Sequence, residues 1–451
     1  MASTDLTSIQ MSPHEDIVGV LKPSQLRAIL EELAFGQPTL RAIPRHQRIE
    51  GLVQTVRALK NEESAIYQRL ITECADQISW SEAMTKHVLD DLLKLISTPS
   101  LTTLLHDELG PETNEDRFQS NPWRATLRYL RPPEVVVHIL AATVPTTPIE
   151  AILLSIAAGV PCLIRSSEHE RAAGRFFLSA LRKVAPELAD HVAVVTWPSD
   201  DELFSHALAH TRPQIVFHGS DESIHNFRCS VPDELQIQAM GHRISFGVLA
   251  PDGPLTRKTL LELCDQIALD ATLFEGMGCM SLQTLFVLPH PSQKDLARTV
   301  ARILVEQSFP KIEATFPRQP LPIDIAAAHM QQLGVVAFAG KAFQGSDGNA
   351  LLWKEVELRS SPGWRHLHVC NAPHLDAVFE ALAPYRDNLS TAGMYLPQER
   401  AESVAKLLAQ SGVRRICRFG HMQRPIFLRA HDGQPRLRAW FQSCDLEGAI
   451  L

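Results

Sequence analysis

The sequence lacks any excess of positive charge. It contains 43 Lys and Arg against 51 Asp and Glu, which gives a formal net charge of −8. Nucleic acids and anionic membranes are attracted by strongly basic surfaces, and the overall charge supplies no such field. We therefore expect no nucleic-acid partner, and any phosphate group of a ligand has to be held by a local site.

Closely spaced cysteines are also missing. No C-x-x-C pair and no Cys/His cluster with zinc-ligand spacing occurs among the eight cysteines, which stand at positions 74, 162, 229, 264, 279, 370, 417 and 444. The sequence therefore predicts no metal site and a reduced, cytoplasmic protein.

No apolar stretch is long enough to cross a membrane. The longest one, residues 149–164, is interrupted by Gly159, Val160 and Pro161, and it is shorter than the roughly 20 residues that a membrane-spanning helix needs. Residues 1–17 have neither the basic nor the apolar part of a secretion signal. We expect no membrane span and no secretion, and the apolar stretch predicts a buried helix followed by a buried strand.

The chain is long enough for more than one compact unit. Domains usually contain roughly 100 to 200 residues, so the 451 residues predict two or three of them. Over residues 24–106, apolar side chains recur at intervals of three and four, which indicates helices. We expect a helical N-terminal region over residues 1–110, and we find no site motif in it.

From residue 134 onwards, short runs rich in Val and Ile alternate with helical segments. These runs show no polar alternation, so the strands are expected to be buried on both faces, as in a parallel, doubly wound α/β sheet. The pattern predicts a Rossmann-like nucleotide-binding unit over residues 111–248, with strands at 134–140, 161–167, 191–197 and 214–218.

A second α/β unit is expected over residues 249–415, preceded by the bridging segment 244–250. It should bear the catalytic group, and its predicted strands lie at 282–288, at 366–372 and near 394. Residues 416–451 are expected to form a C-terminal arm that packs on another part of the protein or serves in oligomerisation.

A glycine and a serine stand where a nucleotide could bind. In FHGSDESI, residues 217–224, Gly219 and Ser220 follow a predicted strand and begin a helix. Free N–H groups at a helix N-terminus bind phosphate, and glycine lets the backbone approach a ligand. The same pattern is also typical of an ordinary capped turn, because serine is favoured at helix N-caps.

Cys279 is the one cysteine in an unusual setting. It follows two glycines in FEGMGCMSLQ, residues 274–283, at a predicted helix-to-strand turn. Nearby free backbone N–H groups could lower the pKa of an accessible thiol and stabilise an oxyanion. The alternative is a small buried apolar residue, and this is our interpretation of the other seven cysteines.

Four segments occur in an order and spacing that identify a family: ATVPTTP (142–148), FHGSDESI, AMGHRISFG (239–247) and FEGMGCMSLQ. With NLSTAGM (388–394) and HDG (431–433), the sequence resembles the aldehyde dehydrogenase superfamily over about residues 130–433. Within it, the sequence resembles the acyl-CoA reductase family typified by LuxC, the fatty-acid reductase subunit of bacterial luminescence. The resemblance implies an aldehyde-dehydrogenase-like α/β fold with a Rossmann-type nucleotide-binding domain, a catalytic domain with a nucleophilic cysteine, and an extension used in oligomerisation.

The resemblance also implies catalytic roles for single residues. Cys279 falls on the nucleophile, and Thr143 falls where an asparagine side chain usually helps to bind the oxyanion. His242 could tune Cys279 or hold the nicotinamide amide, or it could be a histidine satisfied at a domain hinge. Ala239 falls where hydrolytic aldehyde dehydrogenases carry the glutamate that activates water, so an acyl-enzyme here should be poorly hydrolysed. The HDG segment is part of the resemblance, but its His431 and Asp432 could equally be ordinary turn residues of the C-terminal arm.

Six residues are expected at the cofactor. Gly219 and Ser220 fall near the cofactor pyrophosphate, and Arg165 and Glu168 fall near the adenosine ribose. Ser167 belongs to the same segment as Arg165 and Glu168, and Gly241 belongs to AMGHRISFG. Both are expected at the cofactor as well. Glu168 would repel a 2′-phosphate, whereas Arg165 and nearby arginines would attract one, so NADPH is favoured with NADH as the alternative.

The implied reaction is the NAD(P)H-dependent reduction of a fatty-acyl thioester, either acyl-CoA or acyl-protein, to the aldehyde through an acyl-cysteine. The expected partners are an acyl-CoA or acyl-carrier thiol as substrate, further copies of the chain in a homo-oligomer, and an acyl-transferring or acyl-activating protein. Three alternatives stay open: a short-chain acylating aldehyde dehydrogenase, an acyl-phosphate reductase, and a catalytically weak assembly subunit with the same fold.

Overall fold

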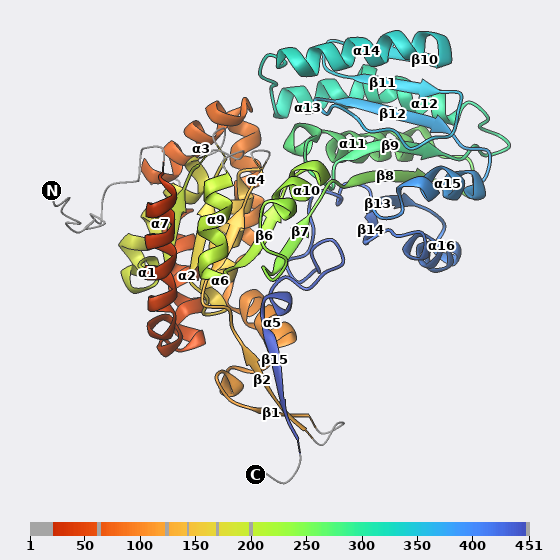
Figure 1. Cartoon of the computed structure of the whole chain (residues 1–451). Coiled ribbons are helices and arrows are strands. Elements are labelled where there is room, and N and C mark those ends of the chain that lie inside the picture. Colours follow the sequence, from red (N-terminus) through yellow and green to blue (C-terminus); the bar gives the residue numbers. More distant parts are fainter. Residues whose placement is uncertain are drawn as a thin grey trace.

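The computed structural model describes residues 21–60, 65–121, 126–141, 144–167, 171–197 and 202–447. Figure 1 shows two α/β halves side by side and a slender extension of strands at the foot of the first half. Among the described helices, none is both long enough and apolar enough to cross a membrane.

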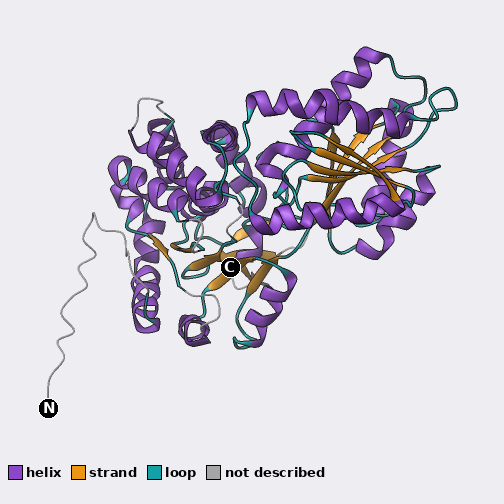
Figure 2. Cartoon of the chain, turned by 90° about the horizontal axis from the view of Figure 1, so that it is seen from above, coloured by secondary structure: helices purple, strands orange, loops and turns teal. Residues whose placement is uncertain are grey.

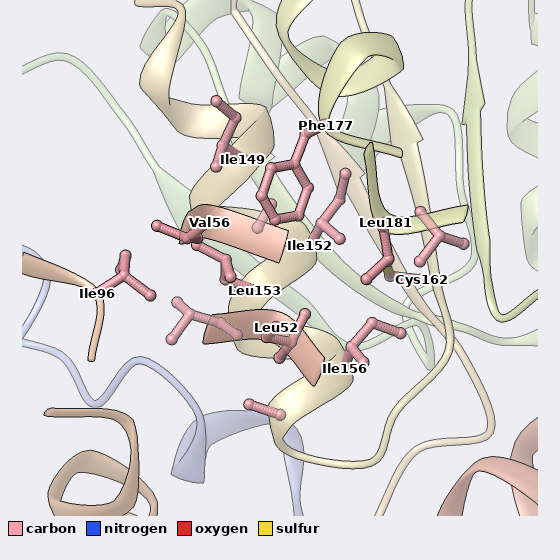
Figure 3. Packing of buried hydrophobic residues seen from close by; sticks show 14 of the residues in the cluster. Leu52, Val56, Ile96, Ile149, Ile152, Leu153, Ile156, Cys162, Phe177 and Leu181 are labelled. Carbon is pink, nitrogen blue, oxygen red and sulfur yellow. The ribbon is translucent and has the colours of Figure 1, made fainter. Parts of the chain in front are cut away.

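Five helices precede the first large sheet and confirm the predicted helical segment over residues 24–106. They are α1 (Pro23–Ala42), α2 (Arg45–Leu59), α3 (Ala65–Ile78), α4 (Glu82–Leu95) and α5 (Thr98–Leu109). Apolar side chains of α2, such as Leu52 and Val56, pack against Ile152 and its neighbours on a helix of the first sheet (Figure 3). The helical region is therefore part of the core of the first half.

The first large sheet has five parallel strands in the order β5-β4-β3-β6-β7. Strands β4 and β5 lie on one side of β3, and β6 and β7 lie on the other, so the strand order reverses at β3. In open α/β sheets, ligands bind in the crevice at such a point, outside the carboxyl ends of the strands. The strands are β3 (Val136–Ile139), β4 (Cys162–Arg165), β5 (Val192–Val195), β6 (Gln214–His218) and β7 (Ile237–Met240). The helices are α6 (Thr146–Ala157), α7 (Ala172–Val184), α8 (Pro186–Ala189), α9 (Glu202–Thr211) and α10 (Asp221–Cys229).

The second large sheet has seven strands in the order β10-β11-β12-β9-β8-β13-β14, with helices on both faces (Figure 2). The β10–β11 pair is antiparallel, and the other five pairs are parallel. The strands are β8 (Ile244–Leu249), β9 (Leu282–Val287), β10 (Gly340–Gln344), β11 (Asn349–Trp353), β12 (His366–Asn371), β13 (Leu389–Tyr395) and β14 (Arg415–Arg418). The α-helices are α11 (Arg257–Thr272), α12 (Leu296–Ile303), α13 (Phe309–Thr315), α14 (Ile323–Ala339), α15 (Leu375–Leu382) and α16 (Gln398–Gln410). Short helical turns complete the chain: η1 (Glu112–Asn114), η2 (Leu273–Gly276), η3 (Leu304–Ser308), η4 (Ala383–Tyr385) and η5 (Arg438–Trp440).

Several strands differ from the expectation, and β7 and β8 lie where the two halves meet. The expected nucleotide-binding unit extends to residue 248, but β8 pairs with β9 and β13 and therefore belongs to the second sheet from Ile244 onwards. The sequence also predicts no strand at β7, because IQAM is too short to show a strand pattern. Its pairing with β6 places it at the edge of the first sheet.

The extension is an antiparallel sheet of β1 (Gln119–Asn121), β2 (Thr126–Arg131) and β15 (Gln442–Leu446). Before the chain reaches β15, it crosses both halves: Phe419 and Met422 lie in the core of the second half, whereas Leu437 and Trp440 lie in the core of the first. The Glu108 carboxylate accepts hydrogen bonds from the three consecutive backbone N–H groups of residues 436–438. The C-terminal segment is thus anchored to the N-terminal helices.

Candidate active site

Cys279 lies in the turn between η2 and β9, and its side chain is exposed. The turn is held by Ser245 at the start of β8, whose hydroxyl donates to the carbonyl oxygen of Cys279 at 2.7 Å. The same hydroxyl accepts the backbone N–H of Thr391 in β13 at 3.0 Å. One serine therefore ties the Cys279 turn to two central strands of the second sheet.

The chain reverses sharply just before Cys279. Phe274, Glu275 and Gly276 all have positive φ, at 61°, 48° and 72°. The Glu275 carbonyl accepts the Trp364 N–H at 2.6 Å, and a Cβ at position 276 would lie 2.9 Å from the Gly363 Cα atom. Only glycine fits at position 276, so the positive φ and the close contact with Gly363 explain the first glycine of the EGMGC segment.

The other predicted segments meet near the start of β8. The His242 N–H donates to an Asp221 carboxylate oxygen at 2.9 Å. The Asn388 amide donates to the other Asp221 oxygen at 3.2 Å and to the His242 carbonyl at 3.1 Å. A Cβ at Gly241 would lie 2.2 Å from Asp221 Oδ1, so a side chain there would break this link. The structure thus gives Asp221 and Asn388 positioning roles that sequence reasoning missed.

The HDG segment forms a tight turn. The backbone groups of His431 and Gln434 exchange hydrogen bonds of 3.0 and 2.9 Å, and Asp432 and Gly433 both have positive φ, as in a two-residue type I′ turn. The turn interpretation of His431 and Asp432 is confirmed. The Asp432 carboxylate also pairs with Arg243 at 3.2 Å, with only 8% of its side chain exposed.

Charge and burial control the protonation of Cys279. The thiol is accessible to solvent but densely surrounded by protein, and loss of hydration raises its pKa to about 11. The negative charge of Asp432 raises the pKa further, whereas Arg429 and Arg243 act in the opposite direction. The resting side chain is therefore a thiol at neutral pH, contrary to the lowered pKa that the turn alone suggested.

A cavity of about 520 Å³ is lined by Met280, the residue that follows Cys279. We call it the α4 cavity, because one wall is α4, which begins at the N-cap Ser81. Its lining is mainly apolar and comes from four distant segments. They are α4 with His87, Val88, Asp91, Leu92, Lys94 and Leu95, the Cys279 turn with Phe274 and Met280, α6 with Thr146 and Glu150, and the C-terminal segment with Arg424, Ile426, Phe427, Arg429 and Arg436. The helical region expected to carry no site motif thus contributes a wall of the site. Its apolar spacing is that of any packed helix, so the sequence held no signal for this role.

A second cavity of about 650 Å³ lies at the carboxyl ends of β3, β4 and β6, and we call it the strand-end cavity. Four of the predicted cofactor residues line it together: Arg165, Ser167, Gly219 and Ser220. Ser220 is also the N-cap of α10, since its hydroxyl accepts the Ser223 N–H at 3.1 Å. The cofactor and capping interpretations of Ser220 are therefore compatible.

Arg165 is oriented toward Trp197 at the strand-end cavity. Its guanidinium donates to the Trp197 carbonyl at 2.8 Å and lies 5.8 Å from the centre of the indole ring. Gly241 lies against Asp221 and does not line this cavity. Thr143 and Glu168 fall outside the described residues. The imidazole of His242 is exposed, and its role stays a prediction.

The strand-end cavity has features that fit a nucleotide cofactor. It lies where the strand order reverses, and its wall includes an arginine, hydroxyl groups and the start of α10. By contrast, within the described ranges no three His, Cys, Asp or Glu side chains gather as metal ligands.

Comparisons with known proteins agree with this geometry. Residues 42–441 match the family model described as acyl-CoA reductase (LuxC). A long-chain acyl-protein thioester reductase of Vibrio harveyi is 22% identical over 383 residues, which cover 82% of this chain and 76% of that protein.

Solved structures also resemble the chain. An NAD-dependent benzaldehyde dehydrogenase from Corynebacterium glutamicum has a TM-score of 0.71 and 14% identity, with 95% of this chain and 91% of that chain covered. A bifunctional proline utilization A protein has a TM-score of 0.73 and 15% identity over 96% of this chain, which spans 45% of that longer chain. The aldehyde-dehydrogenase-like α/β fold expected from the sequence is confirmed.

Proposed function

Because the chain belongs to the acyl-CoA reductase (LuxC) family and is thus a reductase of acyl thioesters, we propose that it reduces fatty-acyl thioesters through a covalent thioester on Cys279. The observation that carries this proposal is the position of Cys279, exposed on a braced turn whose next residue, Met280, lines the mainly apolar α4 cavity. The proposed nucleophile thus stands one residue from the wall of a cavity that could hold an alkyl chain.

The α4 cavity suits the hydrocarbon part of a fatty-acyl group. Its volume of about 520 Å³ is typical of a ligand pocket. Each methylene that leaves water for the apolar wall stabilises binding by about 0.8 kcal/mol. This favours a fatty-acyl substrate over the short-chain acylating alternative.

The covalent step uses groups of the chain itself. The Cys279 sulfur, after loss of its proton, attacks the thioester carbon, and the carbonyl electron pair moves to the oxygen. That oxyanion is stabilised by backbone N–H groups of the turn. The electron pair then returns, the carrier thiolate leaves and takes up a proton, and the acyl group stays on Cys279.

The strand-end cavity would hold the nucleotide cofactor through Arg165, Ser167, Gly219 and Ser220. When bound, a reduced nicotinamide supplies hydride to the acyl carbon. We favour NADPH, since the positive charge of Arg165 in the wall of this cavity would attract a 2′-phosphate, with NADH as the alternative. Arg175, which could assist, already pairs with Glu73 at 3.4 Å.

The remaining expectations stay part of the proposal. The half with the five-stranded sheet would bind the nucleotide, the half with the seven-stranded sheet would supply Cys279, and β1, β2 and β15 would serve in a homo-oligomer. Release of the aldehyde, rather than of acid, follows from the absence of a carboxylate at Ala239 in β7.

The test is to incubate the protein with a mixed pool of acyl-CoA thioesters, without cofactor, and to locate the adduct by mass spectrometry. We expect one fatty-acyl group on Cys279, and unchanged labelling when the exposed Cys444 is replaced by alanine. Labelling at another residue would contradict the mechanism. No labelling at all would favour the assembly-subunit alternative.

A further inference from the structure

The cationic side chains around Cys279 and the α4 cavity differ in how they are paired. Arg243 pairs with Asp432 at 3.2 Å. Arg415 donates to the carbonyl groups of Met422 and His421, both at 2.7 Å. These two guanidinium groups already have their partners.

The cationic groups farther along the α4 cavity are also paired. Arg424 contacts Asp91 at 3.0 Å and His87 at 2.8 Å. Arg436 pairs with Glu150 and donates to the Phe427 carbonyl at 2.6 Å. Their charges are thus used to hold α4, α6 and the C-terminal segment together.

Arg429 is the exception. Its side chain is half-buried and lines the α4 cavity, and its guanidinium has no hydrogen bond or ion pair with any residue in the described part of the chain. It lies near enough to Cys279 to favour the thiolate electrostatically. The carboxylates of Asp432 and Glu150 attract its charge, but each is paired with another arginine. The hydrogen-bond donors of Arg429 therefore stay open to a negatively charged reacting group.

The backbone around Arg429 is held firmly. Two residues earlier, the Phe427 carbonyl is bound by Arg436, and two residues later the tight turn of residues 431–434 begins. The guanidinium is therefore presented from a fixed segment.

We propose that Arg429 is a catalytic residue whose guanidinium stabilises negative charge first on the Cys279 sulfur and then on the acyl oxygen. The first role concerns the free enzyme. The second rests on the proposed function and would supply an oxyanion donor from the C-terminal segment, beside the backbone N–H groups of the turn.

The need for such a group follows from the charges that face Cys279. Asp432 disfavours the thiolate, and Arg243 is neutralised by that same carboxylate. The guanidinium of Arg415 also interacts with Cys279 but is bound to backbone carbonyls. With a pKa of about 11 for Cys279, about one molecule in 10⁴ carries the thiolate at pH 7. Among the described cations around it, Arg429 is the one whose hydrogen-bond donors stay open to the reacting group.

The proton and electrons balance without another reactant. The Cys279 proton passes to water, and the thiolate attacks while Arg429 donates to the oxygen that gains the carbonyl electron pair. When that pair returns, the carrier thiolate leaves and takes one proton from water.

The test measures alkylation of Cys279 by iodoacetamide as a function of pH, with the full chain and no acyl substrate. Arg429→Met should slow alkylation at neutral pH about tenfold, since a shift of one pKa unit changes the thiolate fraction by that factor. Arg429→Lys should restore most of the rate. Asp432→Asn should raise the alkylation rate, because it removes a negative charge that disfavours the thiolate. Arg418→Met, at an exposed arginine of β14, should leave the alkylation rate unchanged.

Acyl transfer tests the second role. Arg429→Met should lower the rate of Cys279 acylation by acyl-CoA further, in total about 10²-fold or more, as expected for loss of an oxyanion donor. The effect should fall on kcat rather than KM.

The two proposals can fail separately. If Arg429→Met alkylates with the wild-type pH profile, or if Arg429→Lys is as impaired as Arg429→Met, the role of Arg429 is wrong even if Cys279 is acylated normally. If alkylation follows the expected pattern but no acyl adduct forms, Arg429 serves the thiolate and the proposed function is wrong.

Discussion

The two cavities of this protein are built in opposite ways. The strand-end cavity is lined by residues at or just after strand ends, such as Ser167 after β4 and Gly219 after β6, and by the neighbouring helices α9 and α10. The α4 cavity combines an N-terminal helix, the Cys279 turn, α6 and a C-terminal segment more than 300 residues away from α4. The first depends on strand ends and the second on side chains brought from distant elements.

This difference separates two demands of the proposed reaction. A cofactor of constant shape can be held by the backbone at strand ends, where parallel sheets always converge. An acyl chain is bound by apolar contact, so its cavity follows the packing of whichever side chains surround it. We expect substitutions to separate the two functions accordingly.

The largest effect should come from Cys279→Ala. It should lower aldehyde formation about 10⁶-fold, the loss seen when a catalytic nucleophile is removed, while nucleotide binding and folding stay nearly unchanged. The measurement is aldehyde release alongside nucleotide titration, with Cys444→Ala as control. Retained activity would show that the chemistry does not occur beside the α4 cavity.

The next effect concerns which product leaves the wild-type protein. Given aldehyde, oxidised cofactor and CoA, it should form the acyl-CoA thioester. It should release free acid at least about 100-fold more slowly than it forms thioester, because general-base assistance is typically worth 10²- to 10⁴-fold. Product analysis with and without CoA measures this ratio. Rapid acid formation without thiol would reveal another base and would contradict the role inferred from Ala239.

The third-largest effect should come from a bulky side chain placed in the α4 cavity. Leu92→Trp should lower kcat/KM for long acyl chains roughly 10- to 200-fold, the range that small changes in an apolar pocket produce. Shorter chains should be affected less, and nucleotide affinity should not change. Leu407→Trp, on the exposed face of α16, is the control. Equal loss for all chain lengths would mean that the acyl group lies elsewhere.

The smallest effect should come from Arg165→Met in the strand-end cavity. It should raise the Kd of NADPH about tenfold, which corresponds to about 1.5 kcal/mol, the lower end of what a hydrogen bond to a charged group contributes. It should leave acylation of Cys279 intact. Titration with NADPH and NADH shows whether the loss of affinity is larger for NADPH. The control is Lys183→Met, at an exposed lysine of α7. An equal loss for both cofactors would count against a contact with the 2′-phosphate.

Much of the fold was predictable because its signals are local. Val- and Ile-rich runs indicated the buried strands β3, β4 and β6, and a glycine with a serine after β6 indicated the start of α10. The two glycines before Cys279 indicated a turn. Each of these signals needs only neighbouring residues.

What the structure adds lies between residues that are far apart in sequence. Asn388 reaches Asp221 across 167 positions, and Arg424 reaches Asp91 across 333. The raised pKa of Cys279 likewise depends on burial and on Asp432, both of which the turn sequence does not contain.

By itself, the sequence determined the alternation of most buried strands and helices, the family motifs and the turn that presents Cys279, since these follow from side-chain periodicity and local backbone geometry. Only the tertiary structure decided three contacts. In it α4 forms a wall of the cavity that Met280 lines, Arg429 lines that cavity with no hydrogen bond or ion pair of its guanidinium among the described residues, and Ser245 braces the Cys279 turn. The physical reason is that these contacts arise from the order of strands in the sheets and from the return of the C-terminal segment to the first half, and neither leaves a periodic signal in the chain.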